Sequence, residues 1–306
     1  MESLQSLKSR TKAVRNVGQI TKAMEVVSAT KMRRAQEVAL NSRPYAFKAL
    51  DLLGKISENT PIQNPLLEKR DIKKTLLMIV ASDKGLAGSF NAQITKVAEN
   101  FLKIKDIKNC AVITIGKKAN AYSLRKKLEI VENISGAGDY ATPSEIENIA
   151  TTIIRGYENK DWDEVIAIST HFRTALKQEV LTRQILPVDI GKIKETVAEI
   201  IPETGRFSEL RSELVENNTA SNDYLLEPSP EITISQLIPH LIKMQIYHLV
   251  LEANASEHSA RRVAMKTASD NAEELVDELT IAYNKARQAG ITKELSEITS
   301  TQTALN

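Results

Sequence analysis

The sequence has few of the residues that build disulfide frameworks or aromatic cores. Among its 306 residues there is one cysteine, Cys110, and aromatic side chains make up 4%. A single cysteine excludes a disulfide framework and a cysteine-ligated metal site, and it suits a reducing compartment. So low an aromatic content is unusual for one large compact core. It suits extended helices that pack through Ala, Leu and Met.

Long apolar runs and an excess of charge of one sign are missing too. The longest apolar run lies near Leu76 to Ala81, far short of the roughly 20 residues that span a bilayer, and the N-terminus has no apolar signal region. The 41 Lys and Arg residues nearly balance 39 Asp and Glu residues. We therefore expect a soluble intracellular protein with no strong overall electrostatic preference.

Proline and glycine are almost absent from the C-terminal stretch. From Ile234 to Asn306 the only proline is Pro239 and the only glycine is Gly290, so the stretch predicts one helix much longer than the average of about 11–12 residues. Apolar or small residues recur along it at alternating spacings of three and four, which is typical of a left-handed coiled-coil seam. The seam positions are Leu237, Leu241, Met244, His248, Leu251, Ala255, His258, Arg262, Met265, Ser269, Ala272, Val276, Leu279, Tyr283, Ala286 and Gly290. The alternative is a helix in the core of a soluble bundle, but so long a helix would outrun a compact domain.

The N-terminal stretch from Ser3 to about Ile56 predicts a second long helix with a seam of the same kind. Its seam positions are Leu4, Leu7, Thr11, Val14, Gly18, Thr21, Glu25, Ser28, Met32, Ala35, Ala39, Ser42, Ala46, Ala49, Leu53 and Ile56. Glu25 is the one bulky polar exception. Pro44 predicts a kink or break just before it, because proline removes a helical hydrogen bond.

Charge favours pairing between the two terminal helices. Residues 1–50 hold ten Lys or Arg against three Glu, whereas residues 231–306 hold seven Lys or Arg against ten Asp or Glu. Opposite charges beside the seams can select the partner and its direction. The alternative for the basic N-terminal helix is an arm that binds nucleic acid, but up to Gln36 it has no aromatic residue to stack on bases.

Between these helices the pattern changes to strands alternating with helices. We predict strands at Thr75–Ser82, Cys110–Ile115, Leu128–Ile134, Glu164–His171 and Gln178–Val188, and helices from about Gln93 to Lys105, at Lys117–Lys127 and at Pro143–Glu158. Such alternation indicates a mostly parallel sheet with crossover helices. The polar segment Gly191–Ser221 predicts a mobile loop or a domain edge. The fold class is therefore α/β with long helices: an antiparallel coiled coil of residues 1–58 and 231–306, with a Rossmann-like α/β domain at 72–222 inserted between them.

Tests for chemistry find no site. The turn after the first strand has Gly85 and Gly88 but neither a dinucleotide nor a triphosphate motif, so Ser82, Asp83 and Gly85 are interpreted as shaping a tight turn. The four histidines have no metal-ligand spacing and are interpreted as seam or surface residues, and Cys110 as an inert core thiol. We predict no catalytic residue, no cofactor and no metal.

The residues by themselves thus indicate a long helical pair that carries a small α/β domain. Such a protein would transmit force or position between distant partners. A second class stays open at this point: a helical arm on an enzyme, in which the α/β domain would be catalytic.

Four stretches carry a resemblance to a known family. They are ITKAMEVVSATKMRRAQ at Ile20–Gln36, DKGLAG at Asp83–Gly88, YLLEP at Tyr224–Pro228 and the stretch Ala264–Glu294. In this order they resemble the gamma subunit of F-type ATP synthase, over essentially the whole chain.

The resemblance implies a non-catalytic central-stalk rotor. The coiled coil would turn inside a hexamer of alternating alpha and beta subunits, the catalytic F1 part, and would couple ATP synthesis in the beta subunits to transport of hydrogen or sodium ions across the membrane. It would also regulate ATPase activity. The α/β domain would sit beside the epsilon subunit and the membrane-embedded c-ring, with no nucleic acid among the partners. The absence of a targeting stretch favours a bacterial protein, peripheral on the cytoplasmic face of the cell membrane.

The resemblance also implies contact residues. Lys22 and Met24 in ITKAM correspond to the position that meets a moving beta-subunit domain. Four residues correspond to polar contacts higher on the coiled coil: Arg287, Gln288, Thr292 and Glu294. Tyr224 corresponds to a residue facing the ring. Each of these could instead be a solvated or seam residue. Where the family usually has a Gly-Ala pair near the C-terminus, this chain has Thr301 and Gln302.

Overall fold

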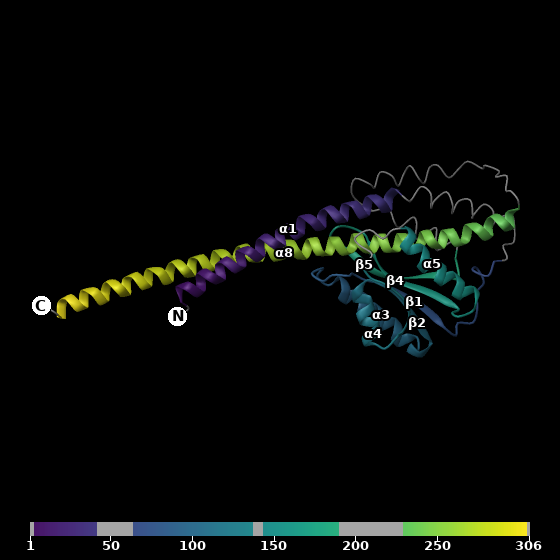
Figure 1. Ribbon diagram of the computed structural model, residues 1–306, viewed down its shortest axis with the longest axis horizontal. Helices are drawn as coiled ribbons and strands as arrows, with labels where there is room; N and C mark the ends of the chain where they lie inside the picture. The colour runs from purple at the N-terminus through teal and green to yellow at the C-terminus, as the bar shows by residue number, and fades with distance from the viewer. Residues whose placement is uncertain (1–2, 42–63, 137–142, 190–228, 305–306) are drawn as a thin grey trace. The chain divides into compact units, whose positions relative to one another are not determined.

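The computed structural model describes residues 3–41, 64–136, 143–189 and 229–304 and divides into two compact units. Residues 1–28 and 261–306 form the coiled-coil unit, and residues 29–260 form the sheet unit. Helix α1 (Leu4–Asn41) and helix α8 (Pro230–Ala304) each contribute to both units (Figure 1). Pro44, the loop 191–221 and Tyr224 lie outside the described residues.

The sheet unit is built on five strands in the order β3-β2-β1-β4-β5. The strands are β1 (Thr75–Val80), β2 (Cys110–Ile115), β3 (Glu129–Ile134), β4 (Glu164–Phe172) and β5 (Gln178–Leu186). The first four are parallel to their neighbours, and β5 returns antiparallel to β4 as a hairpin. The predicted strands and the mostly parallel sheet are therefore confirmed.

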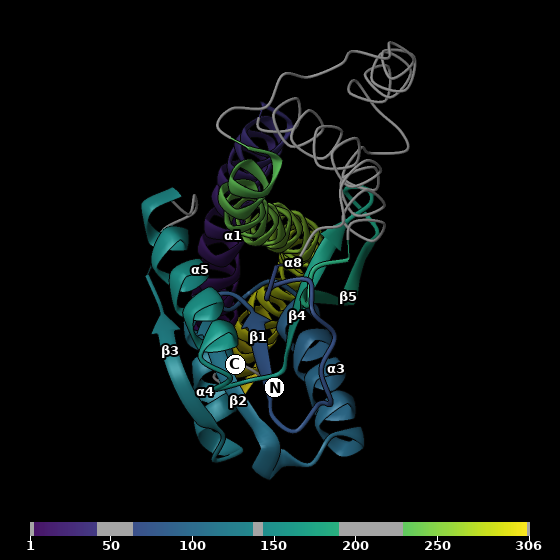
Figure 2. The same ribbon diagram turned by 90° about the vertical axis from the view of Figure 1, so that its right-hand side faces the viewer.

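Helices cover both faces of this sheet (Figure 2). The helices are α3 (Phe90–Ile104), α4 (Lys117–Arg125) and α5 (Pro143–Glu158), with a short 3₁₀ turn η1 (Ile107–Asn109) before β2. Alternate residues of β1 point to opposite faces: Leu77 and Ile79 pack with α3 and α4, whereas Leu76 and Met78 pack with α5 and α8. Cys110 is buried, as predicted, and burial raises the pKa of its thiol.

The first third of α8 is a core helix of the sheet unit. Its apolar residues from Ile238 to Ala253 belong to the same buried cluster as α5 and the strands. The seam positions predicted here are buried or half-buried, but so are most residues between them. Up to about residue 260, α8 thus packs against a sheet, which supplies its second apolar surface, and not in the helical bundle of the alternative.

The turn after β1 is held by its own polar side chains. Asp83 accepts hydrogen bonds from the backbone N–H groups of Lys117 (2.9 Å) and Gly136 (2.8 Å), and the Ser82 hydroxyl donates to the carbonyl of Lys84 (2.6 Å). The interpretation of Ser82 and Asp83 as turn residues is confirmed. The left-handed backbone of this turn falls on Leu86 (φ 62°) and Gly88 (φ 56°), and the part assigned to Gly85 stays a prediction.

Doubly wound sheets bind nucleotides at the carboxyl ends of their strands, where the strand order reverses. In this sheet that point lies between β1 and β4. Here α8 crosses the end of β4: Ser256 Oγ lies 3.4 Å from the carbonyl oxygen of Thr170, and Ser259 Oγ donates to that of Ala175 at 2.6 Å. Together with the Asp83 bonds, these contacts use the polar groups of this edge for internal structure. The catalytic-domain alternative has no support among the described residues.

Candidate partner-contact surface of the coiled coil

The coiled-coil unit has the predicted small-residue seam. Within it α1 and α8 run in opposite directions (Figure 1). Every predicted seam position of α1 from Leu7 to Ser28, and of α8 from Arg262 to Gly290, is buried or half-buried. The two sequence patterns therefore meet as an antiparallel coiled coil, as predicted.

Gly18 marks a close approach between the two helices. A Cβ atom at Gly18 would lie 3.3 Å from the Cβ of Ala272, and the Ser269 hydroxyl reaches the Gly18 carbonyl at 3.5 Å. Only small residues permit this spacing, since a leucine at either position would push the backbones apart. The small seam residues thus set the width of the shaft.

The polar seam residues of α1 satisfy their hydrogen bonds locally. Thr21 and Ser28 donate to carbonyls one turn earlier in their own helix, at 3.0 and 2.7 Å. The Glu25 carboxylate pairs with the Lys22 ammonium at 2.9 Å, and its side chain is only 14% exposed. Glu25, the exception in the seam pattern, is therefore tolerated because its charge is paired at the rim.

Lys22 and Met24 lie on opposite flanks of α1. Two residues apart, they differ by about 200° around the helix. Lys22 is exposed, and the hydrogen bond and charge of Glu25, with smaller effects from Asp270 and Glu273 across the seam, raise the pKa of its ammonium. Met24 is half-buried. The two predicted contact residues therefore do not form one patch.

Met24 belongs to an apolar stripe on the outside of the coil, which the sequence analysis missed. Val17, Ile20 and Val27 are 53%, 60% and 52% exposed, and with Met24 they follow the spacing three, four, three. We call these four residues the α1 stripe. The sequence carries a signal for the α1 stripe, because these four apolar residues form a second repeat beside the repeat of the α1 seam.

The four predicted contacts on α8 are all exposed. Arg287 and Gln288 precede Gly290, and Thr292 and Glu294 follow it. The Thr292 hydroxyl donates to the Gln288 carbonyl at 3.0 Å, which places these two residues on one face. The side chain of Tyr224 lies outside the described residues, so its contact stays a prediction.

Beyond Gly290 the side chains that the structure describes form no seam. All side chains from Ile291 to Ser296 are exposed. Ile291, Leu295 and Ile298, exposed by 51%, 58% and 62%, recur at i, i+4 and i+7, and we call them the α8 stripe. Gln288 lies three residues before this stripe and on the same side. Exposed apolar surface of this extent on a monomer indicates a protein interface.

No group of three or more His, Cys, Asp or Glu side chains suited to a metal ion occurs in the described ranges. Nor does any described helix have the length and apolarity needed to cross a membrane. The fold and its surface define a class of protein: one that combines an α/β domain with an antiparallel coiled coil whose outer surface has exposed apolar stripes.

Comparison with known proteins identifies the family within this class. The ATP synthase family model matches residues 3–305. The ATP synthase gamma chain of Geotalea daltonii is 39% identical over 98% of both chains, and that of Herpetosiphon aurantiacus is 39% identical over all of both. The chain belongs to the ATP synthase gamma chain family.

Solved structures agree on the fold. The Euglena gracilis mitochondrial ATP synthase assembly of OSCP, F1 and c-ring contains a chain with a TM-score of 0.64 and 18% identity, over 99% of this chain and 94% of that one. The Tetrahymena thermophila central stalk and c-ring structure gives a TM-score of 0.57 at 22% identity, over 82% and 99%. The coiled coil with an inserted α/β domain is thus the fold of known central stalks.

Proposed function

We propose that this chain is the rotating central-stalk subunit of an F-type ATP synthase, itself non-catalytic. The observation that carries the proposal is the coiled-coil unit: a narrow antiparallel shaft whose outer surface presents the α1 and α8 stripes. Family membership supplies the partners that such a shaft would need. The ATP chemistry then belongs to the beta subunits, and the shaft changes their nucleotide affinity as it turns.

The structure suits a shaft in two respects. The seam is continuous over Leu7–Ser28 and Arg262–Gly290, and this continuous packing resists bending. The exposed apolar stripes can slide along an apolar surface of the surrounding alpha and beta subunits without a fixed register, since apolar contacts are non-directional. We assign Met24 to contact with the moving beta-subunit domain through the α1 stripe, and Lys22 to the opposite flank.

Polar contacts higher on the shaft are proposed for the exposed residues of α8. Arg287 and Glu294 can form ion pairs with partner charges, and Gln288 and Thr292 can form hydrogen bonds beside the α8 stripe. Tyr224 is proposed to face the c-ring. We keep 1–58, 72–222 and 231–306 as the domain limits of this proposal.

The remaining partners follow from the same proposal. The alpha and beta subunits surround the coiled coil, and the epsilon subunit and the c-ring bind the α/β domain. The chain is then peripheral on the cytoplasmic face of a bacterial cell membrane, where it couples ion transport to ATP synthesis through its partners.

Reconstitution tests the proposal. The chain is mixed with alpha and beta subunits from the same source, and the stoichiometry of the complex and its ATP hydrolysis are measured. We expect one copy per three alpha–beta pairs and hydrolysis that depends on that copy. If the chain stays apart, or hydrolyses ATP alone, the rotor proposal is wrong.

A variant of the α8 stripe sharpens the test. Replacing Ile291 and Leu295 by serine removes apolar area that the alpha and beta subunits would bury. We expect the binding free energy to weaken by about 2 kcal/mol or more, which corresponds to a roughly thirtyfold weaker complex. Ile104→Ser is the matched control, because Ile104 is an 85% exposed residue at the end of α3 in the sheet unit. Equal affinity for both variants would remove the stripe from the interface.

A further inference from the structure

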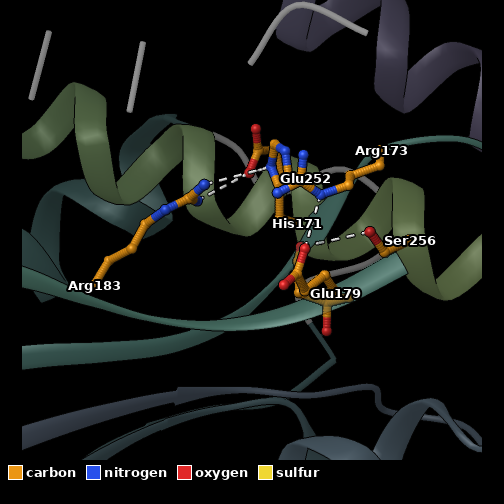
Figure 3. A network of polar contacts seen from close by, with 7 residues as sticks. His171, Arg173, Glu179, Arg183, Glu252 and Ser256 are labelled. Carbon is orange, nitrogen blue, oxygen red and sulfur yellow. Dashed lines mark hydrogen bonds and ion pairs between the residues drawn. The ribbon is translucent and has the colours of Figure 1, made fainter. Parts of the chain in front are cut away.

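A buried cluster of charged groups joins α8 to the β4–β5 hairpin (Figure 3). Glu252 of α8 places one carboxylate oxygen 3.1 Å from His171 Nδ1 and 3.2 Å from Arg183 Nη1. His171 comes from β4 and Arg183 from β5. Exposure of the three residues is 2%, 9% and 5% for His171, Arg183 and Glu252. The interpretation of His171 as a seam or surface residue was therefore wrong, because its partner is 81 residues away in the chain.

The protonation of this cluster follows from its contacts. Burial opposes ionisation of Glu252, but the His171 hydrogen bond and the Arg183 charge outweigh it and hold the pKa of the carboxyl below its ordinary value. His171 Nδ1 lies 3.1 Å from this carboxylate and 3.4 Å from Arg183 Nη2, and it donates to the carboxylate in the tautomer that is protonated at Nδ1. Two donors from two strands thus converge on one oxygen of the helix.

Glu252 begins a polar stripe along α8. Ser256 and Ser259 follow it at i+4 and i+7, so the three side chains share one face of the helix. Ser256 Oγ meets the Thr170 carbonyl, and Ser259 Oγ meets the Ala175 carbonyl. The hairpin tip is held as well, since the Gln178 amide donates to the carbonyls of Thr174 and Ala175 and to Ser259 Oγ.

A second ion pair flanks the cluster within the hairpin. Glu179 lies opposite His171 in the β4–β5 register, and its carboxylate accepts from Arg173 Nε at 2.7 Å. The charged groups facing His171 are therefore Glu252 and Arg183, with Glu179 and its partner Arg173 beside them. This arrangement leaves one ionised carboxylate on α8 against fixed donors on two strands.

These contacts differ in kind from the apolar packing around them. Leu249, Val250 and Ala253 pack α8 on the sheet through apolar contacts, which are non-directional and tolerate small rotations of the helix about its axis. Hydrogen bonds between charged groups depend on angle and distance, so they oppose such rotation. The same helix continues from Arg261 into the coiled-coil unit.

We propose that the cluster of His171, Arg183 and Glu252 is the joint that passes turning force between α8 and the sheet, with Glu252 as its positioning residue. This inference rests on the proposed rotor function. Force on the shaft reaches α8 through its continuous backbone, and the cluster delivers it to β4 and β5. Without this joint, only the less directional apolar packing would resist turning of the helix about its axis.

The test uses the complete ATP synthase with this chain, in membrane vesicles. ATP hydrolysis and ATP-driven ion pumping are both measured, and their ratio reports coupling. For Glu252→Gln we expect hydrolysis to persist while pumping per ATP falls several-fold. If hydrolysis and pumping fall in the same proportion, or neither changes, the joint is not at Glu252.

A second ion pair of α8 provides the matched control. Lys243 Nζ binds the Glu147 carboxylate of α5 at 2.7 Å, and the Glu147 side chain is 60% exposed. It also links α8 to the α/β domain but does so in solvent, where an ion pair is weak. Glu147→Gln should leave the coupling ratio unchanged. A ratio that falls equally in both variants would overturn the proposal.

Loss of folding is separated from loss of coupling by a double variant. Arg183→Met with Glu252→Met replaces a buried ion pair by apolar groups, a change that often preserves stability. We expect this variant to recover the wild-type Tm but not the coupling ratio. Coupling that recovers with Tm would show that the cluster serves stability alone. A wild-type chain that fails to assemble would refute the rotor proposal itself, before any variant is compared.

Discussion

Gly156, in helix α5, lies against the indole ring of Trp162. A Cβ atom at position 156 would lie 2.0 Å from Cζ2 and 2.2 Å from Cη2 of that ring. Both distances are far below van der Waals contact. The ring is 5% exposed, and its Nε1 donates to the Ile153 carbonyl at 3.1 Å. Gly156→Ala therefore forces the indole to move within a packed core.

The expected loss follows from three effects. Overpacking costs about 1–3 kcal/mol, and breaking the buried indole hydrogen bond costs about 1–3 kcal/mol. Replacing glycine by alanine within a helix stabilises the helix by up to about 1 kcal/mol, which offsets part of this loss. We expect Gly156→Ala to lower the free energy of unfolding by about 2–4 kcal/mol.

Trp162 itself reports the outcome, because it is the only tryptophan in the chain. Urea unfolding is followed by its fluorescence, and the midpoint should fall while the native emission shifts. Gly85→Ala is the control in the same unit, since a Cβ there meets nothing within 4 Å. A Gly156→Ala midpoint equal to that of the control would refute the packing argument.

Three further predictions concern the seam, the shaft and the buried cluster. Gly18→Leu should separate the helices at Ala272 and lower the Tm of the coil measured by circular dichroism, whereas Gly18→Ala, at a 3.3 Å contact, should change it little. Gly290→Ala meets nothing within 4 Å and should stabilise α8 by up to about 1 kcal/mol, seen as a higher Tm; a lower value would reveal an unrecognised close contact. The folded-state pKa of Glu252 is depressed, so the stability it contributes is present above its unfolded value of about 4.3 and is lost as pH falls through the folded pKa. The difference in unfolding free energy between wild type and Glu252→Gln should therefore be constant near neutral pH and shrink in acid, and a difference that grows in acid would contradict this sign.

Local patterns determined most of the fold. Strands β1 and β2 are mostly apolar and are buried at every position, as in a strand covered on both faces, and β2 begins and ends where the sequence predicts. The seams of α1 and α8 also followed from spacing, because a helix repeats its faces every 3.6 residues whatever lies around it. The assignment of His171 failed because its partner, Glu252, lies 81 residues away in the chain.

By itself, then, the sequence determined the elements, the two seams and the family, because periodicity and short motifs are local properties. The tertiary structure decided what each face meets. It placed Glu252 beside His171 and Arg183, set Trp162 against Gly156, and turned the first third of α8 into a core helix of the sheet unit. These contacts join residues distant in the chain or depend on how a side chain turns, and no spacing rule encodes them.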